Sequence, residues 1–277
     1  MAGKSEPFAH DLCVVSENTA DSDEAVTAEA AAVFDLSDNT VLFAKNPFEK
    51  LYPASITKIM TALLAIKNGK LSDEVTVTRE AVIKESGASL CGIKPGDKLT
   101  MEQLLYGLLI PSGNDAGAAI AVNMAGSIDQ FAQMMNDEAK ELGATGTHFV
   151  NPHGLSDEDH YTTAYDLYLI FNEALKYPEF RKIIGTAEYR TSYQGSNGKT
   201  VNAVWKGTNW YMTGERSTPD GLTVLGGKTG TTLSAGSCLI MGSSDPSNKE
   251  YISVVLKAPD HAGLYDNMSN ILNKIVE

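Results

Sequence analysis

Residues 53–61, Pro-Ala-Ser-Ile-Thr-Lys-Ile-Met-Thr, open a stretch whose apolar side chains recur every three or four positions. The apolar residues are Ile56, Ile59, Met60, Leu63, Leu64 and Ile66. This spacing places them on one face of a helix, and Asn68-Gly69 is a pair that commonly ends one. We therefore expect a largely buried helix after Pro53, with Ser55 and Lys58 at its start.

Five more helices are predicted downstream. Thr100 and Gln103 have the spacing of a capping box, and Pro111 ends the helix that they begin. Ser127 with Gln130 predicts a second capping box, before a helix that Gly143 closes. The others are an alanine-rich helix after Asn114, one from Thr163 with Asp166 to near Pro178, and a last one from about Ala262.

Short apolar runs predict strands at both ends of the chain. Residues 31–35 and 40–44 flank Ser37-Asp38-Asn39, a composition typical of a hairpin turn. Strand-like runs near the other end are 222–225, 237–241 and 251–256, with a turn at 242–248. Because helices occupy the middle of the chain, this order favours one antiparallel sheet formed by both ends and covered by helices.

Charge and composition exclude several classes of protein. The 277 residues include 22 Lys and Arg against 35 Asp and Glu, a net charge of −13, whereas nucleic-acid binders need a basic surface. Hydrophobic residues make up 43% of the chain, which suits one large domain or two small ones and excludes global disorder. The apolar runs fall far short of the roughly 18 residues that span a bilayer.

The first residues are acidic and lack periodicity, so we predict an acidic, flexible leader at 1–27 and one folded domain at 28–277. The N-terminus also lacks the apolar segment of a secretory signal. Either the protein is not exported, or a signal has been removed. The three cysteines, Cys13, Cys91 and Cys238, are widely spaced and odd in number, so we interpret them as free thiols.

Three short motifs stand out: Ser55-Ile-Thr-Lys58, Ser112-Gly-Asn114 and Lys228-Thr-Gly230. Each alone has an ordinary interpretation, as a first helical turn, a loop turn or a solvated strand edge. At a helix start, however, positions i and i+3 share a face, which puts the Lys58 amine beside the Ser55 hydroxyl. A serine becomes a good nucleophile when such a base takes its proton.

Lys58 can act as this base only if its pKa falls from about 10.4 towards neutrality. Burial and a second cation both lower the pKa of a lysine, and Lys228 is the candidate second cation. The start of the Ser55 helix adds positive potential and backbone N–H groups near a developing oxyanion. These features are therefore consistent with Lys58 acting as the base that activates Ser55.

The three motifs, in this order and approximate spacing, resemble the active site of the penicillin-recognising serine enzymes. Ser112-Gly113-Asn114 is similar to the motif of the low-molecular-weight penicillin-binding proteins, the serine-type D-alanyl-D-alanine carboxypeptidases. Further segments that resemble this family are 53–61, 94–97, 151–155, 163–166 and 235–239, within a resemblance that covers about residues 28–277. It implies an α/β (α+β) fold of the β-lactamase/DD-peptidase type, with a five-stranded antiparallel sheet flanked by helices and a helical subdomain.

The resemblance implies removal of the terminal D-alanine from peptidoglycan stem peptides that end in D-Ala-D-Ala. Ser55 would form the acyl-enzyme, Lys58 would accept its proton, and the N–H groups of Ser55 and Thr231 would hold the oxyanion. Ser112 would relay a proton to the leaving amine, and Asn114 would orient Lys58 and the substrate amide.

The resemblance also implies roles for the residues of the third motif. Lys228 and Thr229 would bind the terminal carboxylate, and Gly230 would let the strand approach the substrate backbone. β-Lactams would act as covalent inhibitors, and no metal or organic cofactor is implied. The expected location is the cell envelope, at the outer face of the cytoplasmic membrane, with membrane contact only through segments absent from this chain.

Alternatives remain within the same fold and outside it. A class A β-lactamase is disfavoured because no Glu-x-x-Leu-Asn follows Ser112, but a DD-endopeptidase or a penicillin-binding sensor that stays acylated remains open. Thr231 replaces the histidine or tyrosine of some relatives, a change that bears on substrate range. The lack of a Gly-x-Ser-x-Gly motif disfavours an α/β-hydrolase.

Other conspicuous residues have plainer interpretations. His148, His153 and His160 suggest a metal site, but no His-Glu-x-x-His occurs. Cys91 borders the implied cleft, and a partly buried free thiol is favoured over a reactive one. Trp205, Trp210 and Tyr211 either line a glycan-facing cleft or pack against the sheet, and we leave them out of the site.

Overall fold

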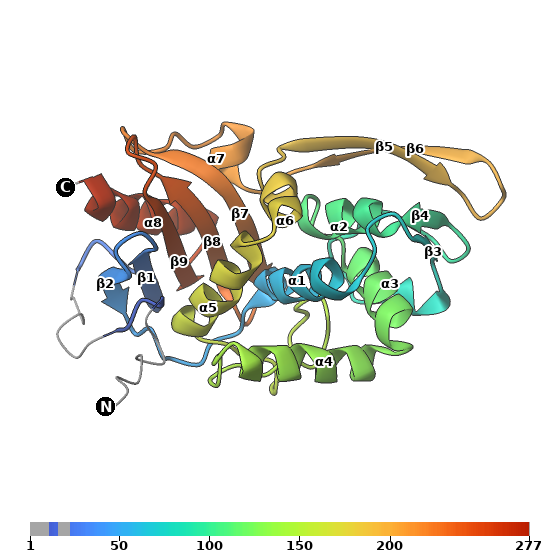
Figure 1. Ribbon diagram of the computed structural model, residues 1–277, viewed down its shortest axis with the longest axis horizontal. Helices are drawn as coiled ribbons and strands as arrows, with labels where there is room; N and C mark the ends of the chain where they lie inside the picture. The colour runs from blue at the N-terminus through green and yellow to red at the C-terminus, as the bar shows by residue number, and fades with distance from the viewer. Residues whose placement is uncertain (1–10, 16–22, 277) are drawn as a thin grey trace, which may run out of the picture.

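The computed structural model describes residues 11–15 and 23–276 (Figure 1). Its larger sheet has the order β2-β1-β9-β8-β7, and every neighbouring pair is antiparallel. These strands are β1 (Ala30–Asp35), β2 (Thr40–Lys45), β7 (Thr223–Thr232), β8 (Gly236–Ser244) and β9 (Glu250–Ala258). Since β1 lies between β2 and β9, the two ends of the chain complete one sheet, and the five-stranded prediction is confirmed.

Helices cover both faces of this sheet (Figure 1). On one face, α8 (His261–Val276) packs Leu264 and Met268 against the strands. On the other face lies α5 (Ala164–Leu175), and α1 (Lys58–Asn68) packs beside α5. Phe34 of β1 stacks on Tyr168 of α5 with ring centroids 4.1 Å apart. Every residue of β1 is buried, as expected for its apolar run from Ala30 to Phe34.

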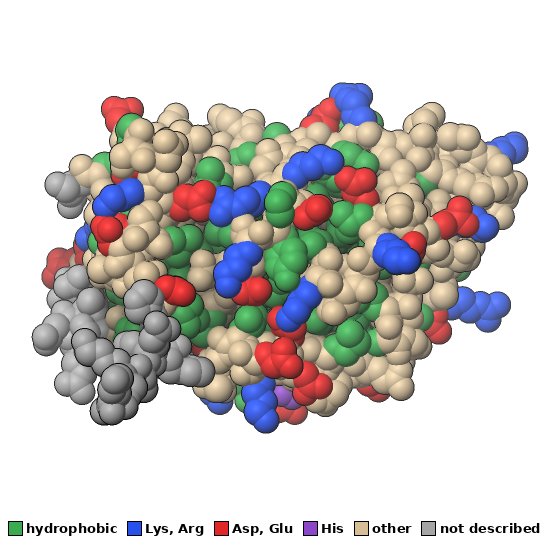
Figure 2. Space-filling view, viewed as in Figure 1, with side chains coloured by type: hydrophobic (Ala, Val, Ile, Leu, Met, Phe, Trp, Pro, Cys, Tyr) green, Lys and Arg blue, Asp and Glu red, His purple; other side chains and the backbone are tan. Residues whose placement is uncertain are grey.

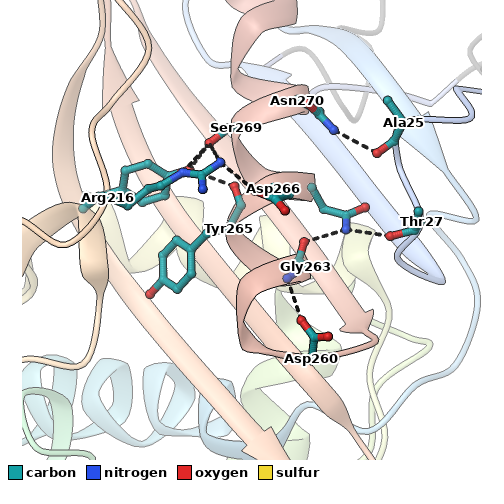
Figure 3. Close-up of polar contacts among 11 residues, drawn as sticks. Ala25, Thr27, Arg216, Asp260, Gly263, Tyr265, Asp266, Ser269 and Asn270 are labelled. Atoms are coloured by element: carbon teal, nitrogen blue, oxygen red, sulfur yellow. Dashed lines mark hydrogen bonds and ion pairs between the residues drawn. The ribbon is translucent and has the colours of Figure 1, made fainter.

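The described parts of the predicted leader contact the rest of the chain. The Cys13 N–H donates to the Tyr168 hydroxyl (2.9 Å), and Cys13 is fully buried. Figure 3 shows the Asn270 amide of α8 bonded to the Ala25 carbonyl (2.8 Å). The Asn267 amide, also on α8, donates to the Thr27 hydroxyl (2.9 Å). Residues 1–10 and 16–22 lie outside the described residues, and the boundary at residue 28 stays a prediction.

A second region, built mainly from the middle of the chain, is largely helical. It contains η3 (Arg79–Ala81), α2 (Met101–Leu109), α3 (Asn114–Ala125), α4 (Ile128–Glu141) and α6 (Pro178–Ile184). Thr100 and Gln103 form the predicted capping box with both reciprocal bonds. At α4, the Ser127 hydroxyl accepts the Gln130 N–H (3.2 Å), which is one half of the second predicted box.

This region also holds a second sheet that the sequence patterns did not predict. Its order is β3-β4-β5-β6, formed by β3 (Glu74–Thr76), β4 (Lys98–Thr100), β5 (Glu188–Gln194) and β6 (Thr200–Lys206). The β5–β6 hairpin projects from the molecule (Figure 1). Exposed and less exposed positions alternate along both of its strands, and Tyr193 and Trp205 are its two buried side chains.

On the face shown in Figure 2, acidic and basic side chains are interspersed between apolar patches. None of the described helices combines the length and the apolar composition needed to cross a bilayer.

Candidate active site

Ser55 lies in a short 3-10 turn, η2 (Ala54–Thr57), that leads into α1. The sequence predicted it at the start of an α-helix, and the structure tightens that start into a 3-10 turn after Ala54, whose φ is +47°. A non-glycine residue in this left-handed region costs about 1–3 kcal/mol. The backbone of Gly154 packs directly against this turn. A Cβ at that position would lie 1.8 Å from the Ala54 carbonyl oxygen, so only glycine allows this contact.

Lys58, the first residue of α1, is fully buried beneath Ser55. Its Nζ lies 2.8 Å from Ser55 Oγ, 2.6 Å from Asn114 Oδ1 and 2.7 Å from the His153 carbonyl oxygen. Burial, followed by the nearby Lys228 charge, lowers the Lys58 pKa well below its usual value. A neutral amine has two N–H groups, which the two carbonyl oxygens can accept, and its lone pair then faces the Ser55 hydroxyl.

The second motif reaches the site through a strained loop. Ser112 has a φ of +64°, and its buried hydroxyl has no hydrogen-bond partner among the described residues. At Gly113, a Cβ would lie 2.7 Å from the Gly107 carbonyl oxygen and from Asp115 Oδ1. Asp115 in turn accepts the N–H groups of residues 91–93 and 116 at 2.8–3.2 Å, so its carboxylate fixes the loop that presents Asn114.

The third motif lies on β7, directly against the nucleophile turn. A Cβ at Gly230 would lie 2.9 Å from the Ser55 backbone nitrogen, so only glycine allows this approach. Lys228 is fully buried, and burial lowers its pKa to about 7. Its Nζ donates to the Thr229 carbonyl (2.8 Å). The Thr229 hydroxyl lies 2.5 Å from that of Thr208, a contact that no motif in the sequence signals.

The loop at residues 151–155 closes the base of the site. Asn151 Oδ1 accepts the Gly154 N–H (2.7 Å), and its Nδ2 donates to the Leu155 carbonyl (2.9 Å). These bonds direct the His153 carbonyl at Lys58. The His153 ring is buried with its pKa lowered to about 3, mainly by burial and then by Lys58, so it is neutral at physiological pH.

A cleft of about 530 Å³ opens above Ser55. Asn114, His153 and Thr231 line it together with Ser55. Its remaining walls are residues 85–89, 154–156 and 232–234. The cleft therefore lies where the helical region meets the β7 edge of the five-stranded sheet.

The chain matches the family model described as D-alanyl-D-alanine carboxypeptidase over residues 16–260. It belongs to this family. D-alanyl-D-alanine carboxypeptidase DacF of Bacillus subtilis is 40% identical over 65% of this chain and 47% of its own length. DacC of Escherichia coli is 36% identical over 84% of this chain and 57% of its own length. The chain thus spans about half of the length of these curated relatives.

Solved structures agree with the family and with the predicted fold. The Streptomyces K15 DD-transpeptidase has a TM-score of 0.83 at 28% identity, covering 90% of this chain and 97% of its own. The D-alanyl-D-alanine carboxypeptidase of Mycobacterium tuberculosis H37Rv has a TM-score of 0.78 at 28% identity, covering 90% of each chain. The β-lactamase/DD-peptidase-like fold that the motifs implied is confirmed.

The structure of this D-alanyl-D-alanine carboxypeptidase family member brings Ser55, Lys58 and Asn114 into direct contact. Gly230 packs on the same turn, and Thr231 lines the same cleft. The sequence did not identify the His153 carbonyl, the Asp115 anchor or Thr208. The Asn-Pro-His-Gly-Leu segment pointed to the first of these regions, but a backbone carbonyl has no sequence signature of its own.

The other conspicuous residues lie in structural positions. The three cysteines are free, and burial raises the Cys91 pKa well above its usual value. His160 accepts the Val150 N–H at Nδ1 and therefore donates from Nε2 to Thr57 (2.8 Å). No group of three or more potential metal ligands occurs within the described part of the chain. Trp205 donates its indole N–H to the Cys91 carbonyl (2.9 Å).

Proposed function

We propose that this chain is the catalytic domain of a serine-type D-Ala-D-Ala carboxypeptidase acting on peptidoglycan stem peptides. The observation that carries the proposal is the contact of the buried Lys58 Nζ with Ser55 Oγ at 2.8 Å. A neutral amine there is a general base for the serine. The nucleophile faces an open cleft, so a peptide can reach it.

Acylation joins Ser55 Oγ to the carbonyl carbon of the penultimate D-alanine. The serine proton moves to Lys58 as the bond forms, and the N–H groups of Ser55 and Thr231 hold the oxyanion. The peptide C–N bond then breaks, and the leaving amine receives a proton through Ser112, whose buried hydroxyl lacks a partner among the described residues. Water hydrolyses the ester and regenerates Ser55.

Lys228 and Thr229 bind the terminal carboxylate in this proposal. The Lys228 pKa is about 7 because of burial, and an anion placed beside the amine favours its protonated form. The Thr229 hydroxyl, next to that of Thr208, supplies a neutral donor. Asn114 holds Lys58 through its Oδ1, which leaves its amide nitrogen to meet the substrate backbone.

The same geometry binds β-lactams, because a strained cyclic amide next to a carboxylate presents the same groups to Ser55 and Lys228. We place the activity in the bacterial cell envelope, at the outer face of the cytoplasmic membrane, where stem peptides occur. A β-lactamase, a DD-endopeptidase and a non-hydrolytic penicillin sensor share the acylation step and differ in the bond they cleave or in the fate of the acyl-enzyme.

The test is incubation with diacetyl-Lys-D-Ala-D-Ala, with release of D-alanine measured and intact mass recorded after penicillin. D-Alanine release together with a long-lived penicillin adduct on Ser55 is expected. A persistent adduct with no D-alanine release would overturn the carboxypeptidase and support the sensor. Rapid loss of the adduct with hydrolysed penicillin would identify a β-lactamase.

Addition of a free amino acid to the peptide assay separates hydrolysis from amine transfer. Water as the acceptor yields the shortened peptide, and an amine acceptor yields a new amide. This comparison matters because the Streptomyces K15 structure is named a DD-transpeptidase, and this chain covers 97% of that structure's length. Amide formed in excess of hydrolysis product would overturn the carboxypeptidase assignment in favour of transfer.

A further inference from the structure

The Lys58 amine joins two segments that lie far apart in the chain. Its Nζ is 2.8 Å from Ser55 Oγ, in the nucleophile turn η2, and 2.7 Å from the His153 carbonyl oxygen, in the loop at residues 150–155. If Lys58 is the base for Ser55, these two segments must keep a fixed separation. The inference below therefore rests on the proposed function.

The ring of His160 bonds to both segments. Its Nε2 lies 2.8 Å from Thr57 Oγ1, in the nucleophile turn, and its Nδ1 accepts the Val150 N–H (3.1 Å), at the start of the loop. Burial lowers the pKa of His160 to about 4, so the ring is neutral at physiological pH. A neutral imidazole has one acceptor and one donor nitrogen. Because a backbone N–H only donates, Nδ1 is the acceptor and Nε2 donates to Thr57.

The bond between His160 and Thr57 lies in a tightly packed environment. Both residues are 1% exposed, and the His160 ring packs edge-on against Phe149 with ring centroids 5.5 Å apart. The His160 N–H donates to the Asp157 carbonyl (3.0 Å). On the other side, a Cβ at Gly154 would lie 2.9 Å from Thr57 Oγ1. Neither side chain has room to turn away from the other.

A second bond between this loop and α1 lies away from the nucleophile turn. The Thr61 hydroxyl donates to the Pro152 carbonyl (2.6 Å), one helical turn after Thr57. It holds the loop to the body of α1, whereas η2 precedes α1 and follows from Ala54 at a φ of +47°. A residue in this conformation keeps it only where surrounding contacts fix it, so the nucleophile turn needs a bond of its own to the loop.

We propose that His160 is a positioning residue for acylation, which sets the distance between the nucleophile turn and the loop that offers the His153 carbonyl to Lys58. The ring acts through one bond to each segment, and it makes no hydrogen bond to Ser55 Oγ or Lys58 Nζ within the described residues. Loss of the bridge should slow acylation and leave binding unchanged, because a misplacement of about 1 Å lowers the rate of a positioned reaction steeply.

The test measures acylation by penicillin in stopped-flow assays, which separate the rate constant from the dissociation constant of the initial complex. His160→Asn keeps an acceptor near Nδ1 and loses the bond to Thr57. It should lower the rate constant about tenfold, as for one lost buried hydrogen bond, with the dissociation constant unchanged. His160→Gln keeps a donor near Nε2 and should be faster than His160→Asn. Rates are taken per acylated site, counted by intact mass, so partial unfolding does not lower them.

Thr57→Val removes the same bond from its other end and should slow acylation to a similar extent. Because both substitutions break one bond, the double variant should be no slower than His160→Asn alone. This pair also tests the proposal if one of the single variants fails to fold.

His148→Asn is the matched control, because His148 lies in the same segment and its Nδ1 bonds to the Asp159 carbonyl (2.6 Å), with no bond to η2 or α1 in the described part of the chain. It should acylate at the wild-type rate. Unchanged rate constants in His160→Asn and Thr57→Val, or effects that add in the double variant, would overturn the positioning role alone. A wild-type protein that forms no penicillin adduct and releases no D-alanine would overturn the proposed function as well.

Discussion

The proposed preference for a free C-terminal carboxylate should fall as the pH rises through 7. Lys228 is fully buried and its pKa is about 7, so its charge disappears in this range. For one titrating group the protonated fraction is about 90% at pH 6, about 10% at pH 8 and about 1% at pH 9. Above pH 7, carboxylate recognition should therefore weaken about tenfold for each pH unit.

The assay measures kcat/KM from pH 6 to 9 for diacetyl-Lys-D-Ala-D-Ala and for the same peptide with a C-terminal amide. Deprotonation of Lys58, whose pKa is also lowered, affects acylation of both peptides equally. The ratio of the two kcat/KM values therefore isolates Lys228, and kcat/KM reports pKa values of the free enzyme. A ratio that stays constant from pH 6 to 9 would refute the assignment of Lys228 to the carboxylate.

Four substitutions probe the rest of the site. Ser55→Ala should abolish both the penicillin adduct, by intact mass, and D-alanine release, whereas Lys58→Ala should lose acylation while circular dichroism shows an intact fold; an adduct on Ser55→Ala would disprove the nucleophile. Asn114→Ala should slow acylation roughly tenfold to a hundredfold in stopped-flow assays, because Lys58 loses a 2.6 Å partner; an unchanged rate contradicts this. Gly154→Ala should lower the free energy of unfolding by at least about 2 kcal/mol in denaturant titrations, since its φ is +88° and the new Cβ meets the Ala54 carbonyl; an unchanged midpoint would be inconsistent with that contact.

The sequence was informative where one side-chain pattern determines the structure. Phe34 lies in an apolar run, and that run is β1, buried between two strands and two helical layers. It was uninformative for β5 and β6, whose outward positions such as Arg190 and Asn202 are polar and whose inward positions include Thr191 and Ala203. The period of two is present in both strands, but Thr191 and Ala203 bury little apolar surface. The packing of the hairpin on α2, as in the stacking of Tyr106 on Tyr189 at 3.7 Å, becomes visible only in the fold.

The same distinction holds for the site. Ser55 and Lys58 were identifiable because a helical spacing of three brings their side chains together. The third partner of Lys58 is the backbone carbonyl of His153, which any residue type could supply, so only the folded loop reveals it. The 3-10 turn at Ser55 likewise depends on Gly154 approaching from about 100 positions away in the chain, a contact that no local pattern encodes.

The role proposed for Lys228 sets substrate binding against stability, because it requires a buried amine to be charged. Lys58 and Lys228 both have a lower pKa in the folded protein than the usual value of about 10.4 in an unfolded chain. Between about pH 7 and 10.4 the unfolded chain therefore binds more protons at Lys228 than the folded one, and its contribution makes stability rise with pH across that window. The carboxylate binding that we propose for Lys228 needs the protonated amine, so this binding weakens as the pH rises. The anchors around the site, Asp115 and Asn151 among them, hold in place an arrangement that the lysines themselves destabilise whenever they are charged.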